Sequence, residues 1–445
     1  MTWRPKEAGL LALVALVFAT GWAGEAVAQA GRLAPGWERT PLELLGLLLL
    51  AHLALGLLRF RGDEVLLPLA ALLCAVGLLV LNYLDPREER AQLLWVALGL
   101  AVMLVVIFGL PDVHLLQHYK YSAAAAGLLL LAVTAVFGRE INGARLWLGV
   151  GPFQFQPSEL MKVLLVIFMA AYLDERREIL SRASYRWHTL KLSPWPYLVP
   201  LILLWGLSLL LLLWQKDLGA TVLMLGIALA MIYAATGRKT FVGAGVLLLL
   251  INVLVTYRLF GYVHERIQVW LHPWQLASGP SYQIVQALFA LAAGGATGTG
   301  LGRGHPGFIP FASTDFVFAA TAEQLGLAGM LALLAVYLLL ALRGVQVALE
   351  HDTSFGQLLA MGCAVVLALQ CLVIVAGNMA LIPLTGITLP FVSYGGSSMV
   401  VNFILLGLLL RLSTPRVISG RWRRRAVGHK PPAAPGAVLI DWPRA

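Results

Sequence analysis

Charged residues are scarce in this chain, and acidic residues are the scarcer kind. Only 12% of the 445 residues are Asp, Glu, Lys or Arg, and 22 of these are acidic. Soluble domains usually carry about 25% charged residues, whereas 60% of this chain is hydrophobic and its mean hydropathy is +0.83. The composition excludes a water-soluble globular protein and predicts a protein that lies in a bilayer.

Cysteine is also rare. Cys74, Cys363 and Cys371 all fall inside apolar runs, which excludes a disulfide scaffold and a cysteine-ligated metal centre, so we expect them to pack as small apolar side chains. His114 and His118 have the i, i+4 spacing of a helical metal site. Their position in a short linker favours a structural interpretation.

Long apolar runs fill most of the chain. Because a crossing takes about 20 apolar residues and lipid-exposed backbone must be helical, they predict an all-α polytopic transmembrane helical bundle. Arg4, Lys6 and the first run, followed by Ala26-Val-Ala28, also fit a cleavable secretory signal, but a first span is favoured. The spans, about twelve, are roughly 8–28, 43–60, 64–84, 92–110, 121–138, 158–174, 196–214, 218–236, 240–258, 322–342, 356–376 and 395–412.

The basic residues predict the orientation. With the N-terminus inside, about two thirds of the 32 Lys and Arg residues fall in inner loops and tails, as the positive-inside rule requires. Both termini are therefore expected in the cytoplasm. The net charge of +10 includes the juxtamembrane run Arg421-Trp-Arg-Arg-Arg425, which is typical of an anchor to anionic membrane lipid, so no nucleic-acid partner is predicted.

The loops suggest one integral membrane domain over 1–430, followed by a flexible cytoplasmic tail at 431–445. The outer loop 259–321 is too apolar for disorder and contains an amphipathic stretch, Tyr282–Ala293, so we interpret it as an ordered cap over the outer mouth of the bundle. Inside it, Gly294–Gly304 resembles a phosphate-binding loop only loosely. Its spacing and the lack of a preceding strand favour a close-packed turn.

Polar residues gather in four clusters, and the parity of the spans puts all four on the outer side. These clusters are 139–162, 215–219, the loop 259–323 and 378–398. Glu159 and Lys162 lie at i, i+3 behind Pro157, so they are expected to share one face of a helix and to pair. Such pairs can be purely structural, but charges are costly in a bilayer, and four clusters on one face indicate a functional site.

Asp315 is a lone carboxylate in a polar loop just before an apolar helix. In that place it can reach water and act on a lipid head group. Phe311, Phe316 and Phe318 flank it, and partial exclusion of water would raise its pKa toward a value useful for a base. The alternative is a helix N-cap, which is common for Asp at such a position.

The motifs around these clusters resemble one family. Asn378-Met-Ala-Leu-Ile-Pro-Leu-Thr-Gly-Ile-Thr-Leu-Pro-Phe-Val-Ser-Tyr-Gly-Gly-Ser-Ser398 is similar to the signature of the SEDS proteins, the group of FtsW, RodA and SpoVE. The resemblance continues through Ala144–Leu148, Phe155–Lys162, Gln215–Gly219, Glu265-Arg266, Tyr282-Gln283 and Ser313–Gly326. Departures are Lys216 for a usual proline, Gln324 for a usual glutamate, and Phe311-Ala312 for a Glu-Ala pair.

The resemblance implies a core of about ten spans over 85–412, with extra N-terminal spans at about 8–60, as in RodA-like members. It implies a glycosyltransferase in the bacterial inner membrane that polymerises peptidoglycan from lipid II on the outer face, in elongation or division. Transfer would be inverting, with undecaprenyl pyrophosphate leaving. Partners would be lipid II, the nascent glycan strand and a class B penicillin-binding protein.

Roles for single residues follow from the same resemblance. Asp315 would be the catalytic base, and Arg145 and Lys162, together with Arg266 or a divalent cation, would stabilise the charge of the departing pyrophosphate. No cofactor is firmly implied, but a divalent cation, Mg²⁺ or Mn²⁺, could be held with Glu159 or Asp217. A lipid flippase or a noncatalytic scaffold are the alternatives. The residues expected to bind substrate are Arg145, Glu159, Lys162, Asp217, Arg266, Gln283, Ser393 and Ser397.

Overall fold

The computed structural model describes residues 4–33, 36–141, 143–150, 153–182, 185–187, 190–192 and 195–414. Helices dominate it, and within these residues nine are long and apolar enough to cross a membrane. The prediction of an all-α polytopic membrane fold is confirmed.

All twelve predicted spans fall on helices. The nine that meet the length and hydropathy of a full crossing are α1 (Pro5–Ala30), α2 (Arg39–Leu57), α3 (Leu66–Leu84), α4 (Pro86–Gly109), α6 (Lys120–Phe137), α9 (Leu218–Thr236), α10 (Lys239–Leu259), α13 (Val317–Glu350) and α14 (Ser354–Asn378). The other three are α7 (Pro157–Arg182), α8 (Trp195–Trp214) and α15 (Gly396–Leu412). Glu159, Lys162 and Asp174 interrupt the apolar stretch of α7. Helix α8 is 20 residues long and apolar throughout, and α15 has 17 residues.

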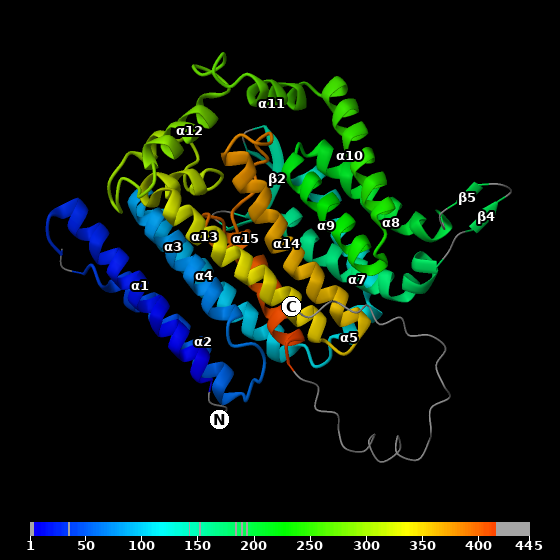
Figure 1. The fold of residues 1–445 in the computed structure, drawn as a ribbon, viewed down its shortest axis with the longest axis horizontal. Coiled ribbons are helices and arrows are strands. Elements are labelled where there is room, and N and C mark those ends of the chain that lie inside the picture. Colours follow the sequence, from blue (N-terminus) through cyan, green and yellow to red (C-terminus); the bar gives the residue numbers. More distant parts are fainter. Residues whose placement is uncertain are drawn as a thin grey trace, which may run out of the picture.

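Helix α14 lies in the middle of the bundle, packed against α7, α9, α13 and α15, while α15 also packs along α4. Two thirds of the most apolar stretch of α14 is buried inside the bundle, compared with 11% of the corresponding stretch of α10. Figure 1 shows α10 on one flank and the α1–α2 hairpin on the other, beside α3 and α4. The buried core therefore lies between the helices next to the polar clusters, and the helices on the two flanks face lipid.

A charge network fixes the first hairpin to one end of the bundle. The Arg4 guanidinium pairs with Glu7 at 2.5 Å and donates to the carbonyl oxygen of Asp63 at 2.7 Å. Glu7 is fully buried and also contacts the ring Nδ1 of His52 at 2.7 Å. The Asp63 carboxylate accepts from Arg343 of α13 at 2.5 Å. Helices α1, α2 and α13 are thereby joined through the loop before α3.

The segment between α10 and α13 is ordered and lies across one end of the bundle (Figure 1). It contains α11 (Gly261–Leu271), α12 (Tyr282–Gly294) and a 3₁₀ turn, η1 (Pro306–Phe308). Helix α12 coincides with the predicted amphipathic stretch. The predicted limits of the domain, 1–430, and of its core, 85–412, stay predictions, and the tail at 431–445 lies outside the described residues.

The glycine-rich run Gly294–Gly304 repairs a break in α13. Gly326 has φ 64° and ψ −168°, a backbone conformation that is essentially restricted to glycine, so two helical bonds across it are lost. Backbone groups of the run replace them, which confirms a close-packed turn. The substitute bonds run from the N–H of Leu327 to Gly295 O, of Ala328 to Ala296 O, of Thr299 to Glu323 O and of Gly300 to Gln324 O, at 2.9–3.1 Å.

Short strands occur in two loops that the hydropathy pattern left unassigned. One loop forms a three-stranded antiparallel sheet in the order β1 (Arg139–Ile141), β2 (Ala144–Val150) and β3 (Phe153–Phe155). The other forms β4 (Tyr185–Trp187) and β5 (Leu190–Leu192). A five-residue helix, α5 (His114–His118), links α4 to α6, and its histidines belong to no metal cluster among the described residues. The first sheet determines which side chains of the 139–162 cluster reach the site.

Candidate active site

One cavity of about 390 Å³ collects side chains from all four polar clusters. It opens between the first sheet, the start of α9, the segments with α11 and α12, and the loop between α14 and α15. The convergence predicted from the parity of the spans is thus confirmed. Its polar and charged lining is Gln156, Lys216, Asp217, Arg266, Gln283, Thr314, Asp315, Thr385, Thr388, Tyr394, Ser397 and Ser398.

The loop that carries Asp315 is fixed through its backbone. The N–H groups of Asp315 and Phe316 both donate to the carbonyl oxygen of Phe311, at 3.1 and 3.2 Å. Asn378 Nδ2 donates to the carbonyl oxygen of Asp315 at 2.7 Å, and Asn378 Oδ1 accepts from the N–H of Ala319 at 3.2 Å. Asn378 therefore ties the loop to the first turn of α13.

Asp315 is not the N-cap of α13. The helix begins at Val317, and Phe316 occupies the capping position without a side-chain bond to the helix. Since Asn378 accepts from the Ala319 N–H instead, the Asp315 carboxylate has no capping role and faces the cavity. The alternative interpretation of this residue is wrong.

Electrostatics suit Asp315 to a base. Removal from water raises the pKa of its carboxyl group from 3.8 to about 6, while the charge of Arg266 and a hydrogen bond from Thr314 act in the opposite direction. Arg266 is held in place because its Nη1 donates to the carbonyl oxygen of Leu384 at 3.0 Å. A carboxylate with such a pKa is ionised near neutral pH and still basic enough to take a proton.

Lys216 and Asp217 form a second charged edge of the cavity. Lys216 is exposed and has φ 62°, a strained conformation for a side chain with a Cβ. Asp217 caps α9 by accepting from the N–H of Ala220 at 2.9 Å, and its other oxygen accepts from Ser158 at 3.1 Å. Burial raises the pKa of Asp217 despite these two bonds. Lys216 supplies the positive charge at this edge of the cavity.

The predicted Glu159–Lys162 pair is present behind the cavity. Lys162 Nζ lies 2.7 Å from Glu159 Oε2, and Lys162 is 1% exposed. Lys162 also donates to Gln370 Oε1 at 2.8 Å, and Gln370 Nε2 donates to the carbonyl oxygen of Thr388 at 2.9 Å. The pair and Asp217 line a smaller cavity of about 20 Å³. This chain of bonds connects α7 to the loop that borders the main cavity.

The remaining predicted residues separate into two groups. Gln283 and Ser397 line the cavity with Asp217, Arg266 and Asp315. Arg145 and Ser393 are outside its lining. Arg145 pairs with Glu140 of the neighbouring strand at 3.3 Å and is half exposed, while Ser393 is buried and donates to the carbonyl oxygen of Thr314 at 2.6 Å. Ser393 thus supports the Asp315 loop from behind.

Several lining residues were not singled out from the sequence as substrate contacts. Gln156, Thr388 and Tyr394 line the cavity, and all three lie in the motifs quoted above or beside them. Tyr394 is fixed by its N–H, which donates to the carbonyl oxygen of Ser313 at 2.8 Å. The sequence offered one indication of their role: Thr388 and Tyr394 lie in the signature 378–398, and Gln156 follows Phe155 in another of the motifs. Their polarity alone did not distinguish them from the polar residues beside them.

The donors around the cavity fit a resident metal ion poorly. Within the described ranges, no three His, Cys, Asp or Glu side chains gather closely enough to hold one. Glu159 is paired with Lys162, and both oxygens of Asp217 accept hydrogen bonds. A divalent cation would need oxygen ligands from the substrate. It stays a prediction, and no step below depends on it.

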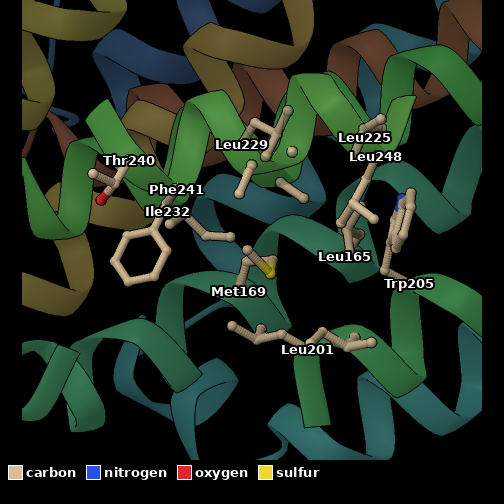
Figure 2. Close-up of a pocket in the computed structure, with 14 residues that line it drawn as sticks. Leu165, Met169, Leu201, Trp205, Leu225, Leu229, Ile232, Thr240, Phe241 and Leu248 are labelled. Carbon is tan, nitrogen blue, oxygen red and sulfur yellow. The ribbon is translucent and has the colours of Figure 1, made fainter. Parts of the chain in front are cut away.

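A different cavity, of about 330 Å³, lies between α7, α8, α9 and α10 (Figure 2). Side chains such as Met169, Leu229 and Phe241 point into it, and the polar atoms visible there are the hydroxyl oxygen of Thr240 and the indole nitrogen of Trp205. The residues that line it include no ionisable side chain. It belongs with the lipid-facing surface of the bundle, and the chemistry belongs to the cavity with Asp315.

The fold and the site define a polytopic membrane protein with a polar, ionisable cavity at one end of a helical bundle. Residues 66–417 match the family of cell cycle proteins that comprises FtsW, RodA and SpoVE. The chain belongs to this family, as the sequence motifs predicted.

Relatives of both main branches are similar over most of the chain. The peptidoglycan glycosyltransferase RodA of Mycobacterium tuberculosis H37Rv is 39% identical over 420 residues, which cover 91% of this chain and 89% of the relative. The probable peptidoglycan glycosyltransferase FtsW of Geobacter metallireducens is 35% identical over 329 residues, covering 73% of this chain and 84% of the relative.

Solved structures agree in fold. A chain from a peptidoglycan synthase complex that coordinates polymerization and crosslinking superposes with a TM-score of 0.66 at 32% identity, covering 79% of this chain and 98% of that one. The crystal structure of the rod shape determining protein RodA of Thermus thermophilus gives 0.56 at 31% identity, with 79% and 97% covered. Both identities support kinship as well as a shared fold.

Proposed function

We propose that this protein is a peptidoglycan glycosyltransferase that polymerises glycan strands from lipid II. The observation that carries the proposal is the cavity that Asp315 lines together with Arg266 and Lys216. A lipid-linked sugar pyrophosphate needs a base for the attacking hydroxyl and cations for the leaving group. Family membership and the names of both relatives support the same activity.

In the proposed reaction, a sugar hydroxyl of the acceptor attacks the anomeric carbon of the donor. Asp315 takes the hydroxyl proton as the new carbon–oxygen bond forms. The bond from the anomeric carbon to the pyrophosphate oxygen breaks, and its electron pair leaves with undecaprenyl pyrophosphate. Arg266 and Lys216 stabilise the charge on that group. A single displacement from the opposite face inverts the configuration at the anomeric carbon.

Labelled lipid II distinguishes this activity from its alternatives. Purified protein with its transpeptidase partner should convert lipid II into long strands, seen on gels. A flippase would move lipid II across vesicles without forming strands, and a scaffold would do neither. The charged groups of the cavity gather at one end of the bundle, whereas transporter sites usually lie near the middle of the bilayer. This placement favours the polymerase.

Polymerisation should fall as the pH drops below about 6, the pKa of Asp315, because the base must be ionised. Arg266 lowers this pKa, so Arg266→Gln should raise it and move the acid limb of the kcat/KM profile to higher pH. The exposed Arg303, which does not line the cavity, gives the control Arg303→Gln. An acid limb that moves equally in both variants, or in neither, would contradict the assignment of Asp315 as base.

The protein is a multi-pass membrane protein, and we place it in the bacterial inner membrane with the Asp315 cavity outside and both termini in the cytoplasm. The Lys and Arg distribution supports this orientation.

Cysteine introduced at exposed Ser278, between α11 and α12, should react with an impermeant thiol reagent in intact cells, and cysteine at Asp352 should not. The native cysteines are buried and give little background. Labelling of the cysteine at position 352 but not of the one at 278 would show that the orientation is the opposite of the one proposed.

A class B penicillin-binding protein is the proposed partner, because a transpeptidase must cross-link the new strand. The similar chain from a synthase complex that coordinates polymerization and crosslinking supports this pairing. The RodA relative is similar at higher identity and over more of this chain than the FtsW relative, 39% over 91% against 35% over 73%, which supports a place on the RodA-like side. Localisation along the side wall rather than at the septum would test that placement.

A further inference from the structure

A second polar cavity, of about 520 Å³, lies at the end of the bundle opposite Asp315. The loop after α2, the end of α4 with the start of α5, the turn between α13 and α14, and the end of α15 enclose it. None of these segments contributes to the candidate active site. The basic and imidazole side chains that line the cavity are Arg59, Arg61, His114, His351 and Arg411.

The lining is strongly cationic. Three arginines stand against one lining carboxylate, that of Asp112, whose Oδ1 already accepts from the N–H of His114 at 3.0 Å. Arg411 is occupied structurally, since it donates to the carbonyl oxygens of Leu110 and Pro111 at 2.9 and 2.7 Å. Arg59 and Arg61 are exposed, and neither side chain bonds to any residue in the described part of the chain. They are the two guanidinium groups available to a ligand.

The backbone conformation of Arg59 is unusual for a residue with a long side chain. Arg59 follows α2 with φ 57°, in the position after a helix where glycine is preferred because it has no Cβ. The N–H of Phe60 closes the turn by donating to the carbonyl oxygen of Leu55 at 2.9 Å. A long cationic side chain at a strained position is more easily explained by what its guanidinium binds than by the turn itself.

The same cavity has an apolar side. Leu58, Ile107 and Phe108 line it next to the arginines, and Leu57 and Leu58 are 64% and 59% exposed on the lipid-facing side of α2. The cavity thus begins where the apolar stretches of α2 and α4 end, at the depth of lipid head groups. A ligand that fills it has an anionic head beside Arg59 and Arg61 and hydrocarbon along Leu58 and Phe108.

We propose that this cavity binds one anionic phospholipid from the leaflet at that end of the bundle. Guanidinium groups present paired donors that match phosphate oxygens, and the neighbouring apolar side chains accept the acyl chains. Arg59 and Arg61 precede the family match at residue 66, whereas His351 and Arg411 lie within it. The lipid therefore bridges the N-terminal hairpin to the family core. The proposal is independent of the glycosyltransferase activity.

Native mass spectrometry and thermal unfolding in detergent test it, with phosphatidylglycerol or phosphatidylcholine added. Phosphatidylglycerol should be retained on the wild-type protein and should raise its Tm, and phosphatidylcholine should do neither. The variant Arg59→Gln/Arg61→Gln should bind phosphatidylglycerol about tenfold more weakly or worse, as expected for lost charge-assisted bonds. The variant Arg32→Gln/Arg87→Gln removes the same charge from exposed residues at the other end and should bind as wild type.

Equal retention of phosphatidylcholine would overturn the proposal, as would the same loss of affinity in both double variants. Displacement of phosphatidylglycerol by millimolar inorganic phosphate would show a site for phosphate alone and would overturn the assignment to lipid. Gel filtration checks that each variant is folded. If the Arg59→Gln/Arg61→Gln protein aggregates, Arg61→Gln alone, at a position without backbone strain, must bind phosphatidylglycerol more weakly than wild type for the proposal to stand.

Discussion

Asp315→Asn should lower the rate of lipid II polymerisation by about 10²–10⁴-fold, the usual contribution of a general base. Asparagine preserves the shape of the side chain but cannot take the hydroxyl proton. Folding should be unaffected, because the Asp315 backbone supplies the bonds that hold the loop, to Phe311 and Asn378. Strand synthesis on gels measures the rate, and thermal unfolding measures stability.

Asp85→Asn is the matched control. Asp85 is the N-cap of α4 at the same end of the bundle, and its Oδ1 accepts from the N–H of Arg87 at 2.8 Å. Asparagine caps helices about as well as aspartate, so this variant should retain both activity and stability. Near wild-type polymerisation by Asp315→Asn would show that the base is another carboxylate, and the candidates would then be Glu159, Asp217 and Glu323.

Lys162→Met should destabilise the protein by about 3–5 kcal/mol, since it leaves the carboxylate of Glu159 buried without its cation. Lys162 is 1% exposed and bonds to both Glu159 and Gln370. Glu159→Gln alone should be destabilising in the same way. Removing both charges, in Glu159→Gln/Lys162→Met, should recover most of the stability, and thermal unfolding of the three variants measures these changes.

Activity then separates structure from chemistry. If Lys162 also helps to stabilise pyrophosphate, the double variant will fold and fail to polymerise lipid II. A folded and fully active double variant would assign the pair to helix packing alone. Gln370→Leu, which removes the second acceptor of Lys162 and keeps both charges, is a useful comparison. It should cost less stability than Lys162→Met.

The sequence predicted those features that depend on local periodicity. Apolar runs located the helices because length and hydropathy alone decide whether a segment can cross a membrane. The i, i+3 spacing of Glu159 and Lys162 predicted their pairing, since a helix puts such residues on one face. Because successive spans cross the membrane in alternate directions, the sequence also predicted that four distant polar clusters lie at one end of the bundle. The cavity lined by Asp315 and Arg266 confirms that the four clusters meet.

Features that depend on distant partners were not predictable. The direction of the Arg145 side chain is set by the register of β1 on β2, where Glu140 lies opposite Arg145, in a segment without clear alternation. Substrate binding by Arg145 stays a prediction. Ser393 faces the carbonyl oxygen of Thr314, 79 residues earlier in the chain. The break at Gly326 depends on backbone groups of the run Gly294–Gly304, and a single glycine inside an apolar helix carries no such information.

The break at Gly326 divides α13 into a short first segment, which ends at Leu325, and a long second segment, which continues to Glu350. An unbroken helix would pass any tilt or rotation of its membrane-spanning part directly to its first turn. Here the helical bonds are interrupted, but the glycine-rich run bonds to both sides of the break: it accepts from Leu327 and Ala328 and donates to Glu323 and Gln324. Asn378 holds the first turn of the helix. The position of the Asp315 loop at the start of α13 is thereby set by the glycine-rich run and by Asn378 as well as by the membrane-spanning part of the helix.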